Sequence, residues 1–337
     1  MRWWRFGQGH QDVPRTAQPG RAGPGAGPQE SATTRRARAA SFRALVHDAF
    51  AKAGRPVALG PNNAHDESGR RYGLWNLASA CHDAAEAGDR ASWPAMIAAH
   101  VRRVTSVPDD VFEGLTAGEA RSRVYARLVP TQSPHVARAS YAQQVVPGVS
   151  RILAFDMPET VASISDEQAE RLGGVAALWA AGLANLRALP VENQQQVTLP
   201  DGGHFVGLTG DSMFTASRVL VMADLLRQMG LPFDARFGVV VAMPHWRTVA
   251  VRTLTGRSAA ALLSIGHVAR FAEMSFAGER GQISPYAYWW RDGQWAQLSQ
   301  AGPGGSTTVV VPGELSQVLE QLPGGGARRS RLPWRRP

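Results

Sequence analysis

The residues Gly210-Asp211-Ser212 stand between two apolar runs and are the first candidates for chemistry in this chain. A serine on a turn between a strand and a helix can act as a nucleophile when a histidine accepts its proton and nearby amides stabilise the oxyanion. His245 and His267 are the candidate bases. No aspartate after Ser212 is followed three residues later by a histidine, so the spacing supports no Asp–His pair that would complete the set.

The same residues also have a simpler interpretation as the cap of a helix. Side-chain oxygens of Asp and Ser accept hydrogen bonds from the first free amides of a helix, and a negative Asp211 suits the positive end of the helix dipole. The apolar run that follows predicts a helix reaching about Gln228. The cap and the nucleophile are therefore the two alternatives for Ser212, and the cap needs fewer partners.

A polar binding site is a second interpretation of this region. It would combine Asp211, Ser217 and Arg218 with the Pro-His-Trp-Arg turn expected between two strands, which carries His245 and Arg247. Loops carry binding residues more often than cores do. The structural alternatives are an ordinary turn histidine and an ion pair between Arg218 and Asp224, since polar groups in an apolar helix are usually paired.

Aromatic residues gather around a hairpin whose tip is Asp292-Gly293. Alternation along a strand places Tyr286, Tyr288 and Trp290 on one face and Trp289 on the other. An exposed aromatic face would bind a partner. The alternative is packing within the core and across the hairpin.

The sequence contains no pattern typical of a metal or cofactor site. The nine histidines form no His-Glu-x-x-His, and no phosphate-binding Gly-x-x-x-x-Gly-Lys occurs, so we expect neither a metal nor a cofactor. The single cysteine, Cys81, rules out a disulfide within the chain and is expected to be buried. This cysteine usage fits a cytoplasmic protein.

The formal net charge of +9 comes from the two ends of the chain. Residues 1–40 and 324–337 are rich in Arg, Gly and Pro, and the body between them is nearly neutral. Such composition predicts disordered basic tails. Weak binding of nucleic acid or a membrane surface is expected only from these tails, and not from the folded body. No apolar run is long enough to span a bilayer.

Between the tails the pattern alternates between helices and short strands. We expect an α+β fold in two halves with antiparallel hairpins, residues 41–157 and 158–323. The first half opens with a helix over residues 41–54. The second opens with a helix from a Ser165–Gln168 capping box to about Leu186, followed by two strands around Asp201-Gly202-Gly203.

Several segments of the chain resemble the YtpQ-like family, a bacterial family known only as a domain of unknown function. The likeness spans roughly residues 41–299 and is carried by segments in the same order and spacing: ARLVPTQSP (126–134), ILAFDMP (152–158), GLANLRALP (182–190), GDSMFTASRVL (210–220), VVVAMPHWRTV (239–249) and EMSFAGERGQISPYAYWWRDGQW (273–295). Family members carry Asp-Gly-Tyr where this chain has Ser212-Met213-Phe214. The resemblance implies a fold and supplies no mechanism.

These observations favour a non-enzymatic cytoplasmic protein that binds a protein or peptide partner. The alternatives are a hydrolase using Ser212 and weak binding of nucleic acid or a membrane surface through the tails. The sequence leaves the oligomeric state open.

Overall fold

The chain is a mixed α+β protein, as its sequence predicts. The computed structural model describes residues 32–60, 63–106, 112–157, 160–255, 257–278, 281–302 and 307–323. The expected tails therefore lie outside the described residues, except for residues 32–40. These nine residues are helical rather than part of a tail, because the first helix begins at Ala32.

Two compact units make up the chain, Met1–Val111 and Phe112–Pro337. We expected the boundary near residue 157, so residues 112–157 belong with the second part instead. The reason is an antiparallel pairing: β4 (Val124–Pro130) and β6 (Val149–Met157) pair along seven residues, and α6 (Val175–Ala188) packs against β4. The sequence predicts each of the two strands, but it does not show that they pair with each other.

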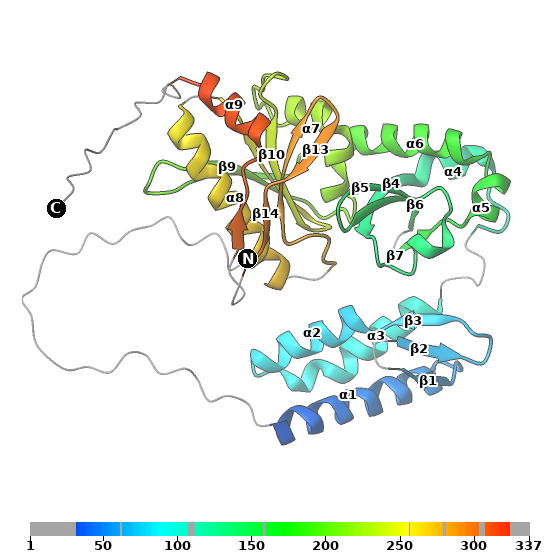
Figure 1. Ribbon diagram of the computed structural model, residues 1–337. Coiled ribbons are helices and arrows are strands. Elements are labelled where there is room, and N and C mark those ends of the chain that lie inside the picture. The colour runs from blue at the N-terminus through cyan, green and yellow to red at the C-terminus, as the bar shows by residue number, and fades with distance from the viewer. Residues whose placement is uncertain are drawn as a thin grey trace, which may run out of the picture. The chain divides into compact units, whose positions relative to one another are not determined.

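Unit 1 combines helices with a small antiparallel sheet (Figure 1). Its core contains Phe50, Tyr72 and Trp93, which are nearly inaccessible, together with the buried Cys81. The sheet order is β1-β2-β3. The elements are α1 (Ala32–Lys52), β1 (Val57–Leu59), β2 (Asn63–Asp66), β3 (Arg71–Gly73), α2 (Trp75–Glu86), the 3-10 helix η1 (Arg90–Ser92) and α3 (Trp93–Thr105).

Unit 2 begins with a four-stranded antiparallel sheet in which β6 pairs with all the other strands. Strand β4 is at its edge, and the short segment around η2 packs on one face through Val136 and Ala139. The elements are α4 (Ala117–Arg123), β4, η2 (Val136–Arg138), β5 (Gln143–Val146), β6 and β7 (Thr160–Ser163).

The helix expected from Ser165 to about Leu186 is interrupted. The Ser165–Gln168 capping box is present and opens α5 (Asp166–Arg171). Gly173 and Gly174 then adopt φ values of 109° and 90°, which are outside the helical region, and α6 starts anew at Val175. The two glycines therefore divide into α5 and α6 the segment that the apolar spacing predicted as one helix.

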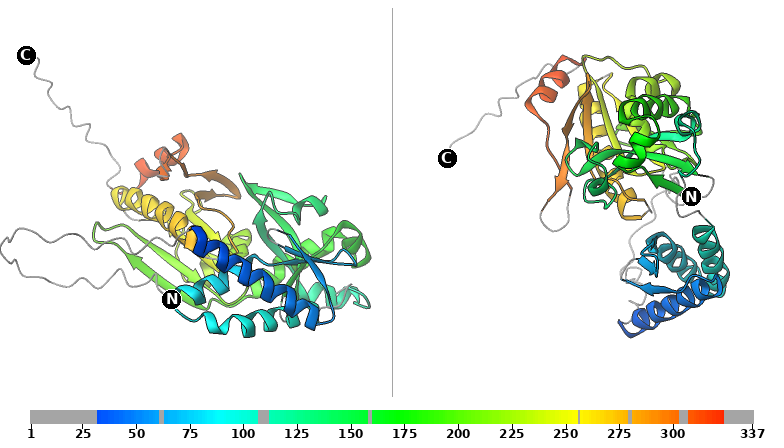
Figure 2. Two further views of the ribbon diagram at one scale, coloured as in Figure 1. Left: turned by 90° about the horizontal axis from the view of Figure 1, so that it is seen from below. Right: turned by 90° about the vertical axis from the view of Figure 1, so that its right-hand side faces the viewer.

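A six-stranded antiparallel sheet forms the rest of unit 2, in the order β13-β12-β10-β11-β9-β8. Alternation along β10 sends Val239, Val241 and Met243 to one face, which η3 and α7 cover. Val240 and Ala242 point to the other face, which α8 and α9 cover (Figures 1 and 2). The elements are β8 (Asn193–Thr198), β9 (His204–Thr209), η3 (Ala216–Val221), α7 (Met222–Gln228), β10 (Val239–His245), β11 (Thr248–Thr253), α8 (Ser258–Gly278), β12 (Ala287–Arg291), β13 (Gln294–Gln297) and α9 (Gly313–Gln321).

Two further strands, β14 (Ser299–Ala301) and β15 (Thr307–Val309), form a separate antiparallel pair. Across the described residues, no helix has the length and apolar character needed to traverse a bilayer.

Candidate functional site

The Gly-Asp-Ser segment forms a turn before η3. The Ser212 Oγ accepts a hydrogen bond from the amide of Phe214 at 3.1 Å, and the Thr215 hydroxyl donates to the Ser212 carbonyl at 2.9 Å. Ser212 thus satisfies one amide of the turn, but the prediction that it caps a helix is wrong: the residue at the N-cap of η3 is Thr215, which makes no side-chain cap hydrogen bond. The following helix differs from the expectation, since it starts as the 3-10 helix η3 and becomes α-helical only in α7.

The Pro-His-Trp-Arg segment is fastened to this turn. Arg247 donates from Nε to the Gly210 carbonyl at 2.8 Å and also bonds the carboxylate of Asp211. In return the Gly210 amide donates to the Arg247 carbonyl at 3.0 Å, and the Ala216 amide donates to the Trp246 carbonyl at 2.8 Å. The structure therefore brings together the two segments that the binding-site hypothesis placed near each other, through a closed set of hydrogen bonds.

His245 lies in a different place from the one we expected. It is the last residue of β10 and is 7% exposed, and the turn itself consists of Trp246 and Arg247. Burial, and then the charge of Arg247, lowers the pKa of His245 to about 4, so the ring is neutral near pH 7. Its Nδ1 is enclosed and has no hydrogen-bond partner among the described residues.

Among the residues that the structure describes, no candidate base contacts the Ser212 hydroxyl. Within the described ranges, no hydrogen bond joins Ser212 to His245 or His267. The ring of His267 instead bonds Asp201 at 2.7 Å, next to the turn between β8 and β9. His267 therefore forms a hydrogen-bonded pair with Asp201 and not with Ser212.

Ser217 and Arg218 are both 1% exposed and serve the packing of η3. The Ser217 Oγ accepts the amide of Leu128 at 2.9 Å, which joins η3 to the edge of β4. Arg218 donates to the Pro190 carbonyl at 2.8 Å and to the side chain of Gln228. Burial lowers the pKa of Arg218, and the nearby negative charge of Glu192 opposes that shift.

The prediction of an ion pair between Arg218 and Asp224 is wrong. Asp224 bonds Arg187 and Arg227 instead, each at 2.8 Å. These two arginines reach Asp224 from α6 and from its own helix, whereas the guanidinium of Arg218 turns toward Pro190. The spacing along one helix could not show the competing arginine on α6.

The aromatic hairpin belongs to the core. Tyr288 is fully buried and bonds the hydroxyl of Ser284 at 2.6 Å, while Tyr286 and Trp290 pack against the same apolar cluster. Trp289 faces the opposite cluster, as alternation predicts. A partner surface centred on Tyr288 is therefore excluded, because the six-stranded sheet uses this face for its own packing.

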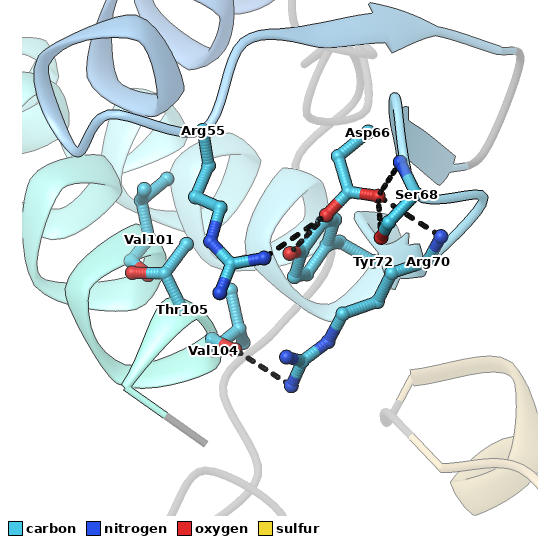
Figure 3. Close-up of polar contacts among 8 residues, drawn as sticks. All are labelled: Arg55, Asp66, Ser68, Arg70, Tyr72, Val101, Val104 and Thr105. Atoms are coloured by element: carbon cyan, nitrogen blue, oxygen red, sulfur yellow. Dashed lines mark hydrogen bonds and ion pairs between the residues drawn. The ribbon is translucent and has the colours of Figure 1, made fainter. Parts of the chain in front are cut away.

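Asp66 in unit 1 illustrates a buried charge whose partners are complete (Figure 3). Its side chain is 5% exposed, and its carboxylate accepts bonds from the amides of Ser68 and Arg70, both at 3.0 Å, from the Ser68 hydroxyl and from Tyr72 at 2.8 Å. Arg55 lies 3.7 Å away. The bond from the Ser68 hydroxyl, with the others, lowers the pKa of Asp66 to about 2. No capacity remains for a ligand.

Arg127 on β4 differs from Asp66 because its charged group lacks hydrogen-bond partners among the described residues. The sequence did not single out this residue. Its Nε is enclosed without a hydrogen-bond partner, while the residue as a whole keeps part of its surface accessible. In the part of the chain that the structure describes, no hydrogen bond or ion pair reaches its guanidinium. Burial is the cause that lowers the pKa of Arg127 to about 10, and no acidic group opposes it. The group is still charged near pH 7.

The surroundings of Arg127 are aromatic and positive. Its guanidinium carbon lies 5.8 Å from the centre of the Trp246 ring, which packs on Gly281, where φ is +70°. Desolvation lowers the pKa of His135, and the positive charges of Arg127 and Arg138 lower it further. The closed hydrogen bonds around Asp211 and Arg247 fix the turn that carries Trp246. One signal could have revealed the site: a lone arginine between Ala126 and Leu128 in an apolar strand.

The residues that the structure describes contain no group of three or more His, Cys, Asp or Glu side chains arranged to hold a metal ion. No protein-family model, curated protein or solved structure matches this chain. The resemblance to the YtpQ-like family therefore stays an interpretation of the sequence, and the site has to be argued from its own chemistry.

Proposed function

We propose that unit 2 is a non-catalytic binding module for an oxyanion, with Arg127 as the principal contact. The observation that carries this proposal is a guanidinium whose Nε is enclosed, and which has no carboxylate, carbonyl or hydroxyl acceptor among the described residues. A partly desolvated charge without a protein partner is unfavourable in the free protein. A ligand that supplies acceptors removes that cost on binding.

The chemistry of arginine defines the ligand class. A guanidinium presents two parallel N–H groups that match a carboxylate or a phosphate, and the match is bidentate and charge-assisted. Trp246 offers an aromatic surface beside this fork, and His135 and Arg138 add no negative charge that would repel an anion. A carboxylate or phosphate group is therefore the expected ligand.

The protein or peptide partner expected from the sequence fits this proposal as one source of the same chemistry, namely the free carboxylate at a peptide C-terminus. The site of that contact moves from the aromatic hairpin to Arg127. We also propose a cytoplasmic location, since the single cysteine suits a reducing compartment and is buried.

The test is titration calorimetry of the full chain with three probes: inorganic phosphate, citrate, and a short peptide with either a free or an amidated C-terminus. Binding should be lost in Arg127→Gln and weakened in Arg127→Lys, which keeps the charge but loses the fork. Arg270→Gln, an exposed position on α8, is the control and should bind as the parent does.

The three probes separate the ligand classes. A peptide that binds only with a free C-terminus assigns the site to a protein partner, and binding of phosphate or citrate alone assigns it to a small anion. Equal binding by the parent chain and Arg127→Gln, or no binding of any probe, would refute the proposal.

A further inference from the structure

Strand β8 ends the six-stranded sheet with an open edge. It pairs with β9 along all six of its residues, Asn193 to Thr198, and β9 is its only partner strand in the described sheet. Five of the six residues are exposed, and Val197 is half-buried. The backbone N–H and C=O groups on the outer edge of β8 therefore have no strand to pair with.

This edge lacks the features that usually prevent pairing with another chain. Proteins protect edge strands with charged side chains, proline or a bulge. The sequence of β8 is Asn-Gln-Gln-Gln-Val-Thr, without a charge or a proline, and its register with β9 runs without a shift from Asn193 to Thr198. The edge is regular and uncharged over six residues.

We propose that β8 pairs with β8 of a second copy of this chain, antiparallel about a two-fold axis that passes between the two Gln195 residues. In this register Gln195 lies opposite Gln195 of the other copy, Gln194 opposite Gln196, and Asn193 opposite Val197, so that opposed side chains share a face of the sheet. The two six-stranded sheets then join into one continuous sheet. A closed two-fold pairing uses the open edge of both copies and leaves none for further growth.

The side chains of β8 favour a second copy over a charged partner. The two-fold axis brings no like charges opposite each other, since the strand carries none. Gln and Asn side chains are both donors and acceptors, so amides that face each other across two strands bond each other.

Two double variants of the full chain test the proposal by sedimentation at several protein concentrations. Gln194→Lys/Gln196→Lys places lysine opposite lysine at both symmetry-related positions, and should raise the dimer dissociation constant at least about tenfold. Gln194→Lys/Gln196→Glu places lysine opposite glutamate at both positions and should keep the dimer. Circular dichroism of each variant establishes that the fold is intact.

Both variants replace the same two residues of β8 by charged ones. A difference between their dimer dissociation constants therefore reports the register and not the stability of β8. A parent chain that stays monomeric at every concentration would overturn the proposal. So would a dimer that survives the lysine pair, which would place the interface on another surface, such as the exposed Leu262 and Leu263 of α8. Loss of the dimer in both variants would exclude this register. Arg127 lies on a different sheet, so anion binding and pairing can fail separately.

Discussion

Arg127 and Arg218 are two arginines of unit 2, the first partly accessible and the second 1% exposed, and their guanidinium groups differ in their partners. Arg218 bonds Pro190 and Gln228, whereas no acceptor reaches Arg127. Replacing Arg127 by methionine removes an unpaired charge and keeps the volume, so we expect the free energy of unfolding to rise by about 0.5–2 kcal/mol. Arg218→Met removes the hydrogen bonds that this enclosed side chain donates to Pro190 and Gln228, and should lower it by about 1–3 kcal/mol.

Urea unfolding of both variants measures these changes. The comparison separates a binding residue from a structural one, because a structural arginine stabilises the free protein. A loss of stability in Arg127→Met as large as that in Arg218→Met would show that Arg127 has partners in the folded chain, and it would remove the basis for the oxyanion site.

Asp66 makes a pH-dependent contribution to unit 1. Its pKa is lowered from 3.8 to about 2, so its stabilising effect is present above pH 3.8 and is lost as the pH falls toward 2. Asp66→Asn should therefore lower the melting temperature of unit 1 near neutral pH, and this difference should shrink as the pH falls from 4 to 2. Thermal melts at several pH values measure it. Glu67→Gln, an exposed neighbour, serves as the control and should show no such convergence.

At the scale of elements, two helical glycines of unit 2 have opposite roles. A Cβ on Gly182 of α6 would lie 2.8 Å from the backbone nitrogen of Ala126, so α6 and β4 approach each other closely only because this residue is glycine. Gly182→Ala should cost about 1–3 kcal/mol of stability. A Cβ on Gly266 of α8 meets nothing within 4 Å, so Gly266→Ala should stabilise by about 0.4–1 kcal/mol. Urea unfolding of both variants tests the opposite signs, and two changes of the same sign would contradict this account.

Local sequence signals predicted the local elements well. The Ser165–Gln168 capping box is formed, and the hairpin tip at Asp292-Gly293 takes positive φ values of 47° and 76°. Such features depend on residues a few positions apart. His245 was misplaced because Pro244 suggested a turn, whereas β10 runs through it to pair with β11. Arg127 was missed because alternation tells which face a residue occupies and not which distant segment covers that face.

At the scale of the whole molecule, each unit has a hydrophobic core of its own. Phe50 lies in the core of unit 1, where its ring centre is 4.9 Å from that of Tyr72, and Leu208 lies in the core of unit 2; both are fully buried. Compact units with separate cores are expected to unfold as separate cooperative transitions. Phe50→Ala should cost about 3–5 kcal/mol and Leu208→Ala about 2–5 kcal/mol, each within its own unit.

Hydrogen exchange read by mass spectrometry follows both units in one full-length chain. In Phe50→Ala, protection should fall in peptides from α1 and α3 and stay unchanged in β10 and β11. Leu208→Ala should give the reverse pattern, so each variant is the control for the other. Equal loss of protection in both units from either substitution would mean that the chain unfolds as one cooperative body. Binding at Arg127 would then depend on the core of unit 1, whereas separate transitions leave that site intact when unit 1 is weakened.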